Sequence, residues 1–342
     1  MFAPVARLVR NQLSESWHLG AAAVARPGGE LVARIGDPQL PVYLRSSAKP
    51  FQIQPLLAAD GEMRFALDDA DLALICASHS GTEEHAARAL SLLERGGFTV
   101  ADLLCGAHPP LDPEVAAALA ARGPVAGTPT PLHNNCSGKH AGMLLACRAL
   151  GLPTADYIDL AHPLQRQILA VLTAVTGLEE REIQAGVDGC SAPAFYLSLA
   201  AGARAYAALA DPPAAGLREP LARGLARAAE AMTAVPEMVA GPRRFTTALM
   251  RETGGRILGK EGAEGVYGLA IRGPVALGVL LKIADGGERA RDAVVLELLA
   301  QLGAVSGEEL ERLAAFRRLP QRNHRGILVG TIEPDLELEP PQ

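Results

Sequence analysis

The sequence predicts an α+β fold in which one antiparallel sheet is built from both ends of the chain and the middle is mainly helical. Apolar runs on either side of Pro27-Gly28-Gly29, and again around Arg272-Gly273-Pro274, are typical of β-hairpins. Between them, residues 155–235 are rich in Ala, Leu and Arg at helical spacing. Strands that cluster at the two ends, rather than alternating with helices, favour a sheet with a separate helical part.

We expect a single two-lobed domain over residues 1–335. The sheet lobe is predicted to comprise residues 1–45 and 255–330, and the helical lobe residues 46–254. The acidic, proline-containing tail at 336–342 is expected to be disordered.

The individual elements follow from local signals. A hairpin at 19–37 leads to a third strand at 40–44, and a helix is predicted from Pro50 to Gly61. The segment 82–96 reads as a helix because Thr82 can cap it and acidic residues fill its first turn. A polar turn within 134–151 is predicted to lead into a helix that ends at Gly151. A further helix is predicted over 288–303, and strands over 265–271 and 275–285.

Composition excludes several classes of function. The chain has 342 residues, of which 49% are hydrophobic, and a formal net charge of −6. This charge disfavours nucleic-acid and anionic-membrane partners. We find no targeting segment or membrane-spanning stretch and expect a cytoplasmic protein. Five cysteines, an odd number in a large chain, favour buried or functional thiols over a disulfide framework.

Lysine is rare in this sequence. Only four of the 32 basic residues are lysines, namely Lys49, Lys139, Lys260 and Lys282. Arginine can replace lysine where only a positive charge is needed. A lysine amine, by contrast, can lose its proton or coordinate a metal. Three of the four lie in stretches rich in Gly or Ser. Chance placement is the alternative explanation.

The first lysine belongs to an S-x-x-K motif. In YLRSSAKPFQ, Ser46 precedes Lys49 by three residues, so the two side chains share a face of a helix. A lysine with a lowered pKa can take the proton of a serine hydroxyl. Alone the motif is weak, because a helix cap followed by a solvated lysine gives the same letters.

The order of later motifs strengthens this interpretation. Penicillin-recognising serine enzymes carry S-x-x-K, then S-D-N, then K-T-G. Here Ser78-His79-Ser80 and Lys260-Glu261-Gly262 follow in the same order. We therefore predict two Ser–Lys pairs, Ser46 with Lys49 and Ser78 with Lys260.

A second cluster contains cysteines. In HNNCSGKHAG, Cys136 is followed by Lys139 and His140, and Cys190 lies in the polar turn VDGCSAP. Two thiolates and a nitrogen would suit zinc, although lysine is an unusual ligand. A buried thiol pair in a Gly-rich turn is the alternative. Asp188, beside Cys190, could bind a substrate ammonium group, and a plain turn explains it equally well.

Eight stretches in order resemble the bacterial asparaginase II family, the Rhizobium-type L-asparaginases. They are ESWHLG, RSSAKPFQIQPLL, ASHSG, LLCGAHPPLD, HNNCSGKHAGML, GVDGCSAP, KEGAEGVYG and LKIADGGERA. The resemblance spans residues 10–304. Two positions depart from the family pattern, Asn11 and Thr246, and the second could alter substrate affinity.

The resemblance implies a fold like that of serine β-lactamases and glutaminases, a homodimer, and hydrolysis of L-asparagine to L-aspartate and ammonia. It places the two catalytic pairs at Ser46/Lys49 and Ser78/Lys260, and one zinc ion at Cys136, Lys139 and Cys190. We expect the zinc to tune substrate affinity, and we expect substrate contacts from Arg45, Asn135, His140 and Asp188.

Other functions remain open at this point. A glutaminase or a β-lactam-recognising serine hydrolase could share this scaffold. A non-catalytic amino-acid-binding protein would bind asparagine without releasing ammonia, and a zinc hydrolase would use metal-bound water. The motifs do not decide which serine is acylated, although Ser46 fits the S-x-x-K analogy better.

Overall fold

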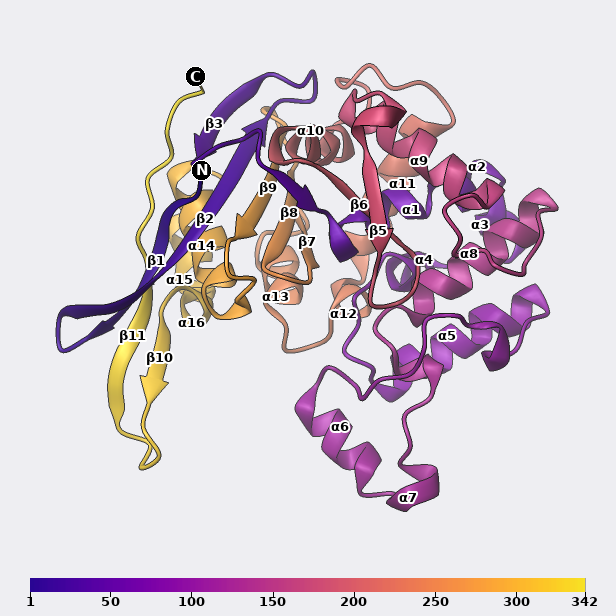
Figure 1. The fold of residues 1–342 in the computed structure, drawn as a ribbon, viewed down its shortest axis with the longest axis horizontal. Helices are drawn as coiled ribbons and strands as arrows, with labels where there is room; N and C mark the ends of the chain where they lie inside the picture. The colour runs from indigo at the N-terminus through magenta and orange to yellow at the C-terminus, as the bar shows by residue number, and fades with distance from the viewer. Residues whose placement is uncertain (342) are drawn as a thin grey trace. The chain divides into compact units, whose positions relative to one another are not determined.

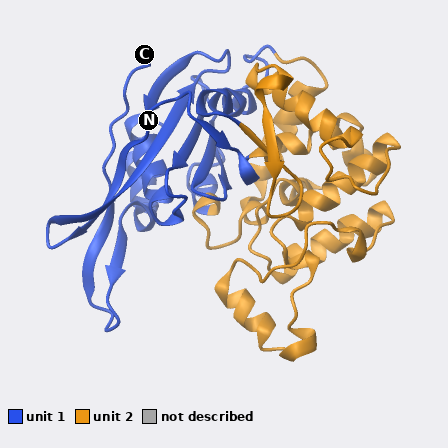
Figure 2. Cartoon of the chain, in the orientation of Figure 1, with its two compact units in different colours: residues 1–47, 197–216, 248–342 blue, residues 48–196, 217–247 orange. Residues whose placement is uncertain are grey.

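The computed structural model describes residues 1–341, which form two compact units (Figure 2). Unit 1 contains residues 1–47, 197–216 and 248–342, and unit 2 contains residues 48–196 and 217–247. Each unit is therefore assembled from segments that are distant in the sequence. No helix within the described residues is long and apolar enough to cross a bilayer.

Unit 1 is built on an antiparallel sheet, which confirms the α+β prediction (Figure 1). Over the described residues the sheet has eight strands, in the order β10-β11-β1-β2-β9-β8-β7, with β3 also paired to β2. The strands are β1 (Ala3–Arg10), β2 (Leu13–Ala25), β3 (Leu31–Ile35), β7 (Ile257–Gly262), β8 (Val266–Ile271), β9 (Leu277–Ile283), β10 (Leu319–Arg322) and β11 (Leu328–Pro334). The first and last strands of the chain, β1 and β11, are direct neighbours.

Two helices cover opposite faces of this sheet. A Cβ added to Gly268 on β8 or to Gly278 on β9 would meet α10 (Leu199–Ala210) at about 2.0 Å. Arg291 of α14 (Glu288–Gln301) instead lies over the ring of Tyr267, one residue along β8. Because successive side chains of a strand point to opposite faces, α10 and α14 pack on different sides.

This packing corrects the predicted lobe boundaries. We expected residues 46–254 to form the helical lobe, but α10 belongs to the sheet unit. The glycines on β8 and β9 allow a close approach between α10 and the sheet, and Ala/Leu spacing along the helix does not reveal it.

The rest of unit 1 surrounds the sheet. It includes β4 (Pro41–Tyr43), α15 (Gly307–Arg312) and α16 (Ala314–Arg317). The tail, for which we expected disorder, is ordered as far as it is described: Glu339 forms a backbone bridge with Arg34, and the Leu338 N–H donates to Gln301. Residue 342 lies outside the described residues.

Unit 2 is mainly helical. Its helices are α1 (Lys49–Gln52), α2 (Gln54–Ala58), α3 (Gly61–Arg64), α4 (Asp69–Ile75), α5 (Glu83–Gly96), α6 (Pro113–Ala120), α7 (Gly123–Ala126), α8 (Ser137–Leu150), α9 (Pro163–Thr176), α11 (Leu221–Ala234) and α12 (Pro236–Val239), and α13 (Phe245–Glu252) begins here and ends in unit 1. A small hairpin joins β5 (Gln184–Val187) to β6 (Pro193–Ser198).

Capping signals identified α5 and α8, although α5 ends with the left-handed Gly97 and not with Gly96 as we expected. Thr82 caps α5 in a capping box with His85, and Gly151 ends α8 in a left-handed conformation, as expected. The helix predicted from Pro50 to Gly61 was wrong. Pro55 follows a break at Ile53, and Gly61 begins α3 instead of ending a longer helix.

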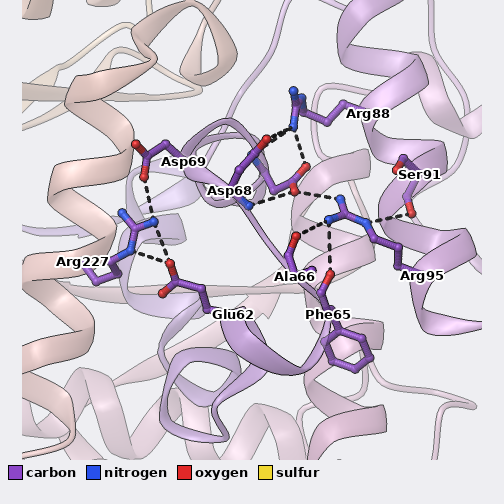
Figure 3. Close-up of polar contacts among 10 residues, drawn as sticks. Glu62, Phe65, Ala66, Asp68, Asp69, Arg88, Ser91, Arg95 and Arg227 are labelled. Atoms are coloured by element: carbon purple, nitrogen blue, oxygen red, sulfur yellow. Dashed lines mark hydrogen bonds and ion pairs between the residues drawn. The ribbon is translucent and has the colours of Figure 1, made fainter.

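An ion-pair network fixes α4, which leads into Ser78. Asp71, only 2% exposed, lies 2.8 Å from both Arg88 and Arg95 of α5. Arg227 of α11 binds Asp69 and Glu62 in the same region (Figure 3). Breaking a buried pair by removing one partner typically costs about 3–5 kcal/mol, so this network holds α4 against α5 and α11.

Candidate active site

Ser46 lies in a tight turn of unit 1. The 3₁₀ turn Arg45–Ala48 follows β4, and α1 begins directly after it with Lys49. Arg45 has a φ of 50°, a left-handed conformation that non-glycine residues rarely adopt. Ser46 belongs to unit 1 and Lys49 to unit 2, so the pairing of their side chains stays a prediction.

In unit 2, the structure brings Lys49 to Ser78. Lys49 is 1% exposed, and its Nζ lies 3.2 Å from the Ser78 Oγ. It also donates to the backbone oxygen of Ala77, and at 3.4 Å to that of Asn135. Three oxygen atoms, from Ala77, Ser78 and Asn135, thus surround the Lys49 Nζ. The Ser78 Oγ accepts the hydrogen bond from Lys49, so the Ser78 hydroxyl can donate its own proton to another group.

Lys260 is also completely buried, on the edge strand β7 of unit 1. Its Nζ donates to the Glu261 carbonyl at 2.8 Å. The Glu261 carboxylate forms a buried ion pair with Arg291 at 3.1 Å. Because Ser78 and Lys260 belong to different units, their pairing stays a prediction.

The structure places the three predicted metal ligands together in unit 2. The Lys139 Nζ lies 2.9 Å from the Cys190 Sγ, and both residues are almost completely buried. A hydrogen bond from the Cys190 thiol holds the pKa of Cys136 well below its ordinary value, against the effect of burial and with help from the charges of Lys49 and Lys139. The same hydrogen bond and burial raise the pKa of Cys190.

This donor set fits zinc. Two cysteine sulfurs and a lysine nitrogen lie within one buried cluster, and zinc prefers sulfur and nitrogen ligands. Burial alone would lower the pKa of Lys139, but the charges of Cys190 and Cys136 raise it. Zinc binding therefore has to displace that proton. Within residues 1–341 no group of three His, Cys, Asp or Glu side chains is placed to bind a metal.

The predicted substrate-binding residues have different environments. His140 is fully buried, and its Nδ1 lies 2.7 Å from the Tyr157 hydroxyl. Its Nε2 has no hydrogen-bond partner among the described residues. Burial and the nearby lysine charges lower the pKa of His140 well below its ordinary value, so the ring is neutral. The Asn135 Oδ1 lies 3.3 Å from the His108 Nε2. Asp188 is half-buried, and its carboxylate accepts a hydrogen bond from the Gly189 N–H within the same turn.

Sequence reasoning assigned no role to His79, although the residue links two parts of this site. His79 is fully buried, and its Nδ1 accepts from the Gly81 N–H. Its Nε2 therefore donates to the Ser137 Oγ, at 2.9 Å. His79 thus ties the segment of Ser78 to the start of α8, beside Cys136. No spacing rule in the sequence signals this contact.

Together these residues define an α+β protein with a buried Ser–Lys pair beside a Cys–Lys–Cys cluster. The profile of the L-asparaginase II family matches residues 6–334. The chain belongs to this family, which confirms the resemblance.

Comparison of structures finds several crystal structures of Mglu. One, in its tris and glutamate form, is 16% identical, with a TM-score of 0.36 over 83% of this chain and 59% of that chain. Another, in its native form in 4.3 M NaCl, is 17% identical, with a TM-score of 0.37 over 85% of this chain and 62% of that chain. The chain thus spans less than two thirds of these proteins. No curated protein matches the sequence significantly.

Proposed function

We propose that this protein is an L-asparaginase that hydrolyses the side-chain amide of L-asparagine to L-aspartate and ammonia through an acyl-enzyme. Family membership supports the reaction. The observation that carries the mechanism is the buried hydrogen bond between Lys49 and Ser78, because it joins an amine to a hydroxyl that can pass a proton.

In this mechanism the Ser46 Oγ attacks the amide carbon, and Lys49 accepts the hydroxyl proton. Lys49 must enter the reaction as the free amine, which leaves its lone pair to accept that proton. Ser78 accepts a hydrogen bond from Lys49, so it can pass a proton from Lys49 to the departing ammonia. Lys260 is proposed to complete the second pair with Ser78.

Backbone N–H donors would stabilise the oxyanion, each typically contributing a factor of about 10²–10³. Water then attacks the acyl-enzyme, and the same proton path runs in reverse to release aspartate and restore the Ser46 hydroxyl.

We also propose that Cys136, Lys139 and Cys190 bind one zinc ion per chain. When bound, zinc supplies a fixed positive charge and holds its ligands in place. Among the causes that lower the pKa of Cys136 is a side-chain hydrogen bond from Lys49, so the metal cluster and the Ser–Lys pair are contiguous. This contact supports a role of the cluster in tuning substrate affinity.

Arg45, Asn135, His140 and Asp188 are proposed to bind the α-amino and α-carboxylate groups of the substrate. The unpartnered Nε2 of His140 supports this role, because a buried polar atom without a partner is costly unless a ligand or water completes it. A homodimer remains a prediction from the family resemblance, and light scattering tests it.

The test is an ammonia-release assay with asparagine and glutamine, with and without chelator, and in parallel with a chromogenic β-lactam. We expect turnover of asparagine by the wild type and a loss of at least about 10²-fold in Ser78→Ala, the lower range for loss of a proton-transfer group. Ser91→Ala on α5 serves as the control.

Saturable asparagine binding without ammonia release would identify a non-catalytic binding protein. Turnover that vanishes on chelation while Ser46→Ala and Ser78→Ala remain active would identify a zinc hydrolase. Preferred turnover of glutamine or of the β-lactam would contradict the proposed substrate.

A further inference from the structure

The turn that carries Ser46 needs external support. Arg45 adopts a left-handed conformation, and such backbone persists only where the surrounding structure determines it. Part of the support is local: the Ser47 Oγ donates to the Leu44 carbonyl at 2.6 Å. A second part comes from β7, where a Cβ at Gly262 would lie 2.8 Å from the Leu44 oxygen. Only glycine allows this close approach.

The third support comes from Tyr206 of α10. Its hydroxyl donates to the Ser47 carbonyl at 2.7 Å, across 159 residues of sequence. Tyr206 is fully buried, so the contact is shielded from competing water. The bond constrains the peptide that follows Ser47, and so helps to hold the backbone of the turn that carries Ser46.

The ring of Tyr206 is itself fixed by the sheet. A Cβ at Gly268 would lie 2.0 Å from the ring, so the ring occupies the space that any other residue would fill. Gly268 is the direct cross-strand partner of Lys260. One side chain thus joins the turn of Ser46 to the strand pair that carries Lys260, entirely within unit 1.

We propose that Tyr206 is a positioning residue that holds Ser46 in its reactive orientation. The inference rests on the proposed function, since it assumes that Ser46 reacts. If Tyr206 had a purely structural role, only its ring would matter, because the ring fills the core. If Tyr206 positions the turn, its hydroxyl group is needed as well. Tyr206→Phe separates the two, because it keeps the ring against Gly268 and removes only the bond to Ser47.

We expect Tyr206→Phe to lower kcat for asparagine about five- to tenfold, the factor that one hydrogen bond of ordinary strength provides. KM should change less than kcat, because of the proposed substrate contacts only Arg45 lies in this turn. The second readout is the rate at which a fluorophosphonate probe modifies Ser46, measured by peptide mass spectrometry, and this rate should fall in parallel. Tyr43→Phe, on a half-exposed side chain, is the matched control.

An unchanged kcat and an unchanged rate of Ser46 modification in folded Tyr206→Phe would overturn the inference. So would an equal loss in Tyr43→Phe. Absence of ammonia release by the wild type would reject the proposed function instead, and the modification rate would still decide the role of Tyr206.

If Tyr206→Phe does not fold, Gly268→Ala replaces it. The added methyl group pushes the ring away from the strand. Slower modification of Ser46 in this variant supports the inference, and an unchanged rate contradicts it.

Discussion

Replacing Lys49 with arginine tests whether its amine or only its charge is needed. The backbone oxygens of Ala77 and Asn135 and the Ser78 Oγ converge on the single Nζ atom of Lys49. The side chain is 1% exposed, so no space is left for a larger head group. A planar guanidinium cannot direct its donors to three acceptors around one nitrogen, and it does not lose a proton at ordinary pH.

We expect Lys49→Arg to lose at least about 10²-fold in turnover, which corresponds to about 2.7 kcal/mol of transition-state stabilisation. Lys260→Arg should lose a similar factor, because Lys260 is completely buried on β7. Lys282→Arg is the control, since Lys282 is only partly buried and its Nζ donates to the Glu264 carbonyl at 2.7 Å, which arginine can also do.

The assay is ammonia release under saturating asparagine, with circular dichroism and thermal melting as folding controls. Activity of folded Lys49→Arg within about threefold of the wild type would refute the general-base argument, because loss of such a base costs at least about 10²-fold. Equal losses in all three arginine variants would point to a general effect of the substitution.

Four further predictions follow from other features. Elemental analysis should find about one zinc per chain, and Cys136→Ser/Cys190→Ser should lose it; undiminished zinc in the double variant would exclude this site. The specificity constant for asparagine should exceed that for glutamine, since one methylene is worth roughly 1–3 kcal/mol in a close-fitting site; equal constants would contradict this. Gly278→Ala should destabilise the protein by about 3 kcal/mol in denaturant titration, the upper end of the usual cost of overpacking, because its Cβ would lie 2.0 Å from backbone of α10. Burial opposes ionisation of Asp112, but backbone N–H groups of α6 and the charge of Arg243 outweigh it and lower the pKa of this carboxyl group. The ionised carboxylate therefore stabilises the fold above its ordinary pKa of about 3.9, and this stabilisation is lost as the pH falls below that value. The melting temperature of Asp112→Asn should therefore lie below that of the wild type at pH 7 and approach it near pH 3.

The sequence predicted local features well and distant contacts poorly. Thr82 and Gly151 act within their own helices, so their signals were readable. The contact between Lys49 and Ser78 joins residues 29 apart, and the motifs did not reveal it, because they paired Lys49 with Ser46 and Ser78 with Lys260. Those two pairings stay predictions. Spacing in a sequence reports only neighbours along one element.

The membership of elements in the two units also escaped prediction. The placement of α10 depends on Gly268 and Gly278, whose missing side chains let the helix approach the strands. A glycine within a strand indicates that another backbone or side chain approaches the strand closely, but the sequence does not identify which element does so. The sequence singled out Cys136, Lys139 and Cys190 as residue types, but it did not reveal the link between Cys136 and Lys49. Zinc binding by these residues stays a prediction.

The pairing of β1 with β11 has a consequence for synthesis on the ribosome. The strand β1 is synthesised long before its neighbour on one side, which is made of residues 328–334. Until residues 328–334 have been synthesised, β1 exposes an unpaired edge that other nascent chains could pair with. A stop codon that removes β11 would leave this edge open permanently. Truncated chains should therefore aggregate, although every residue of unit 2 is still present.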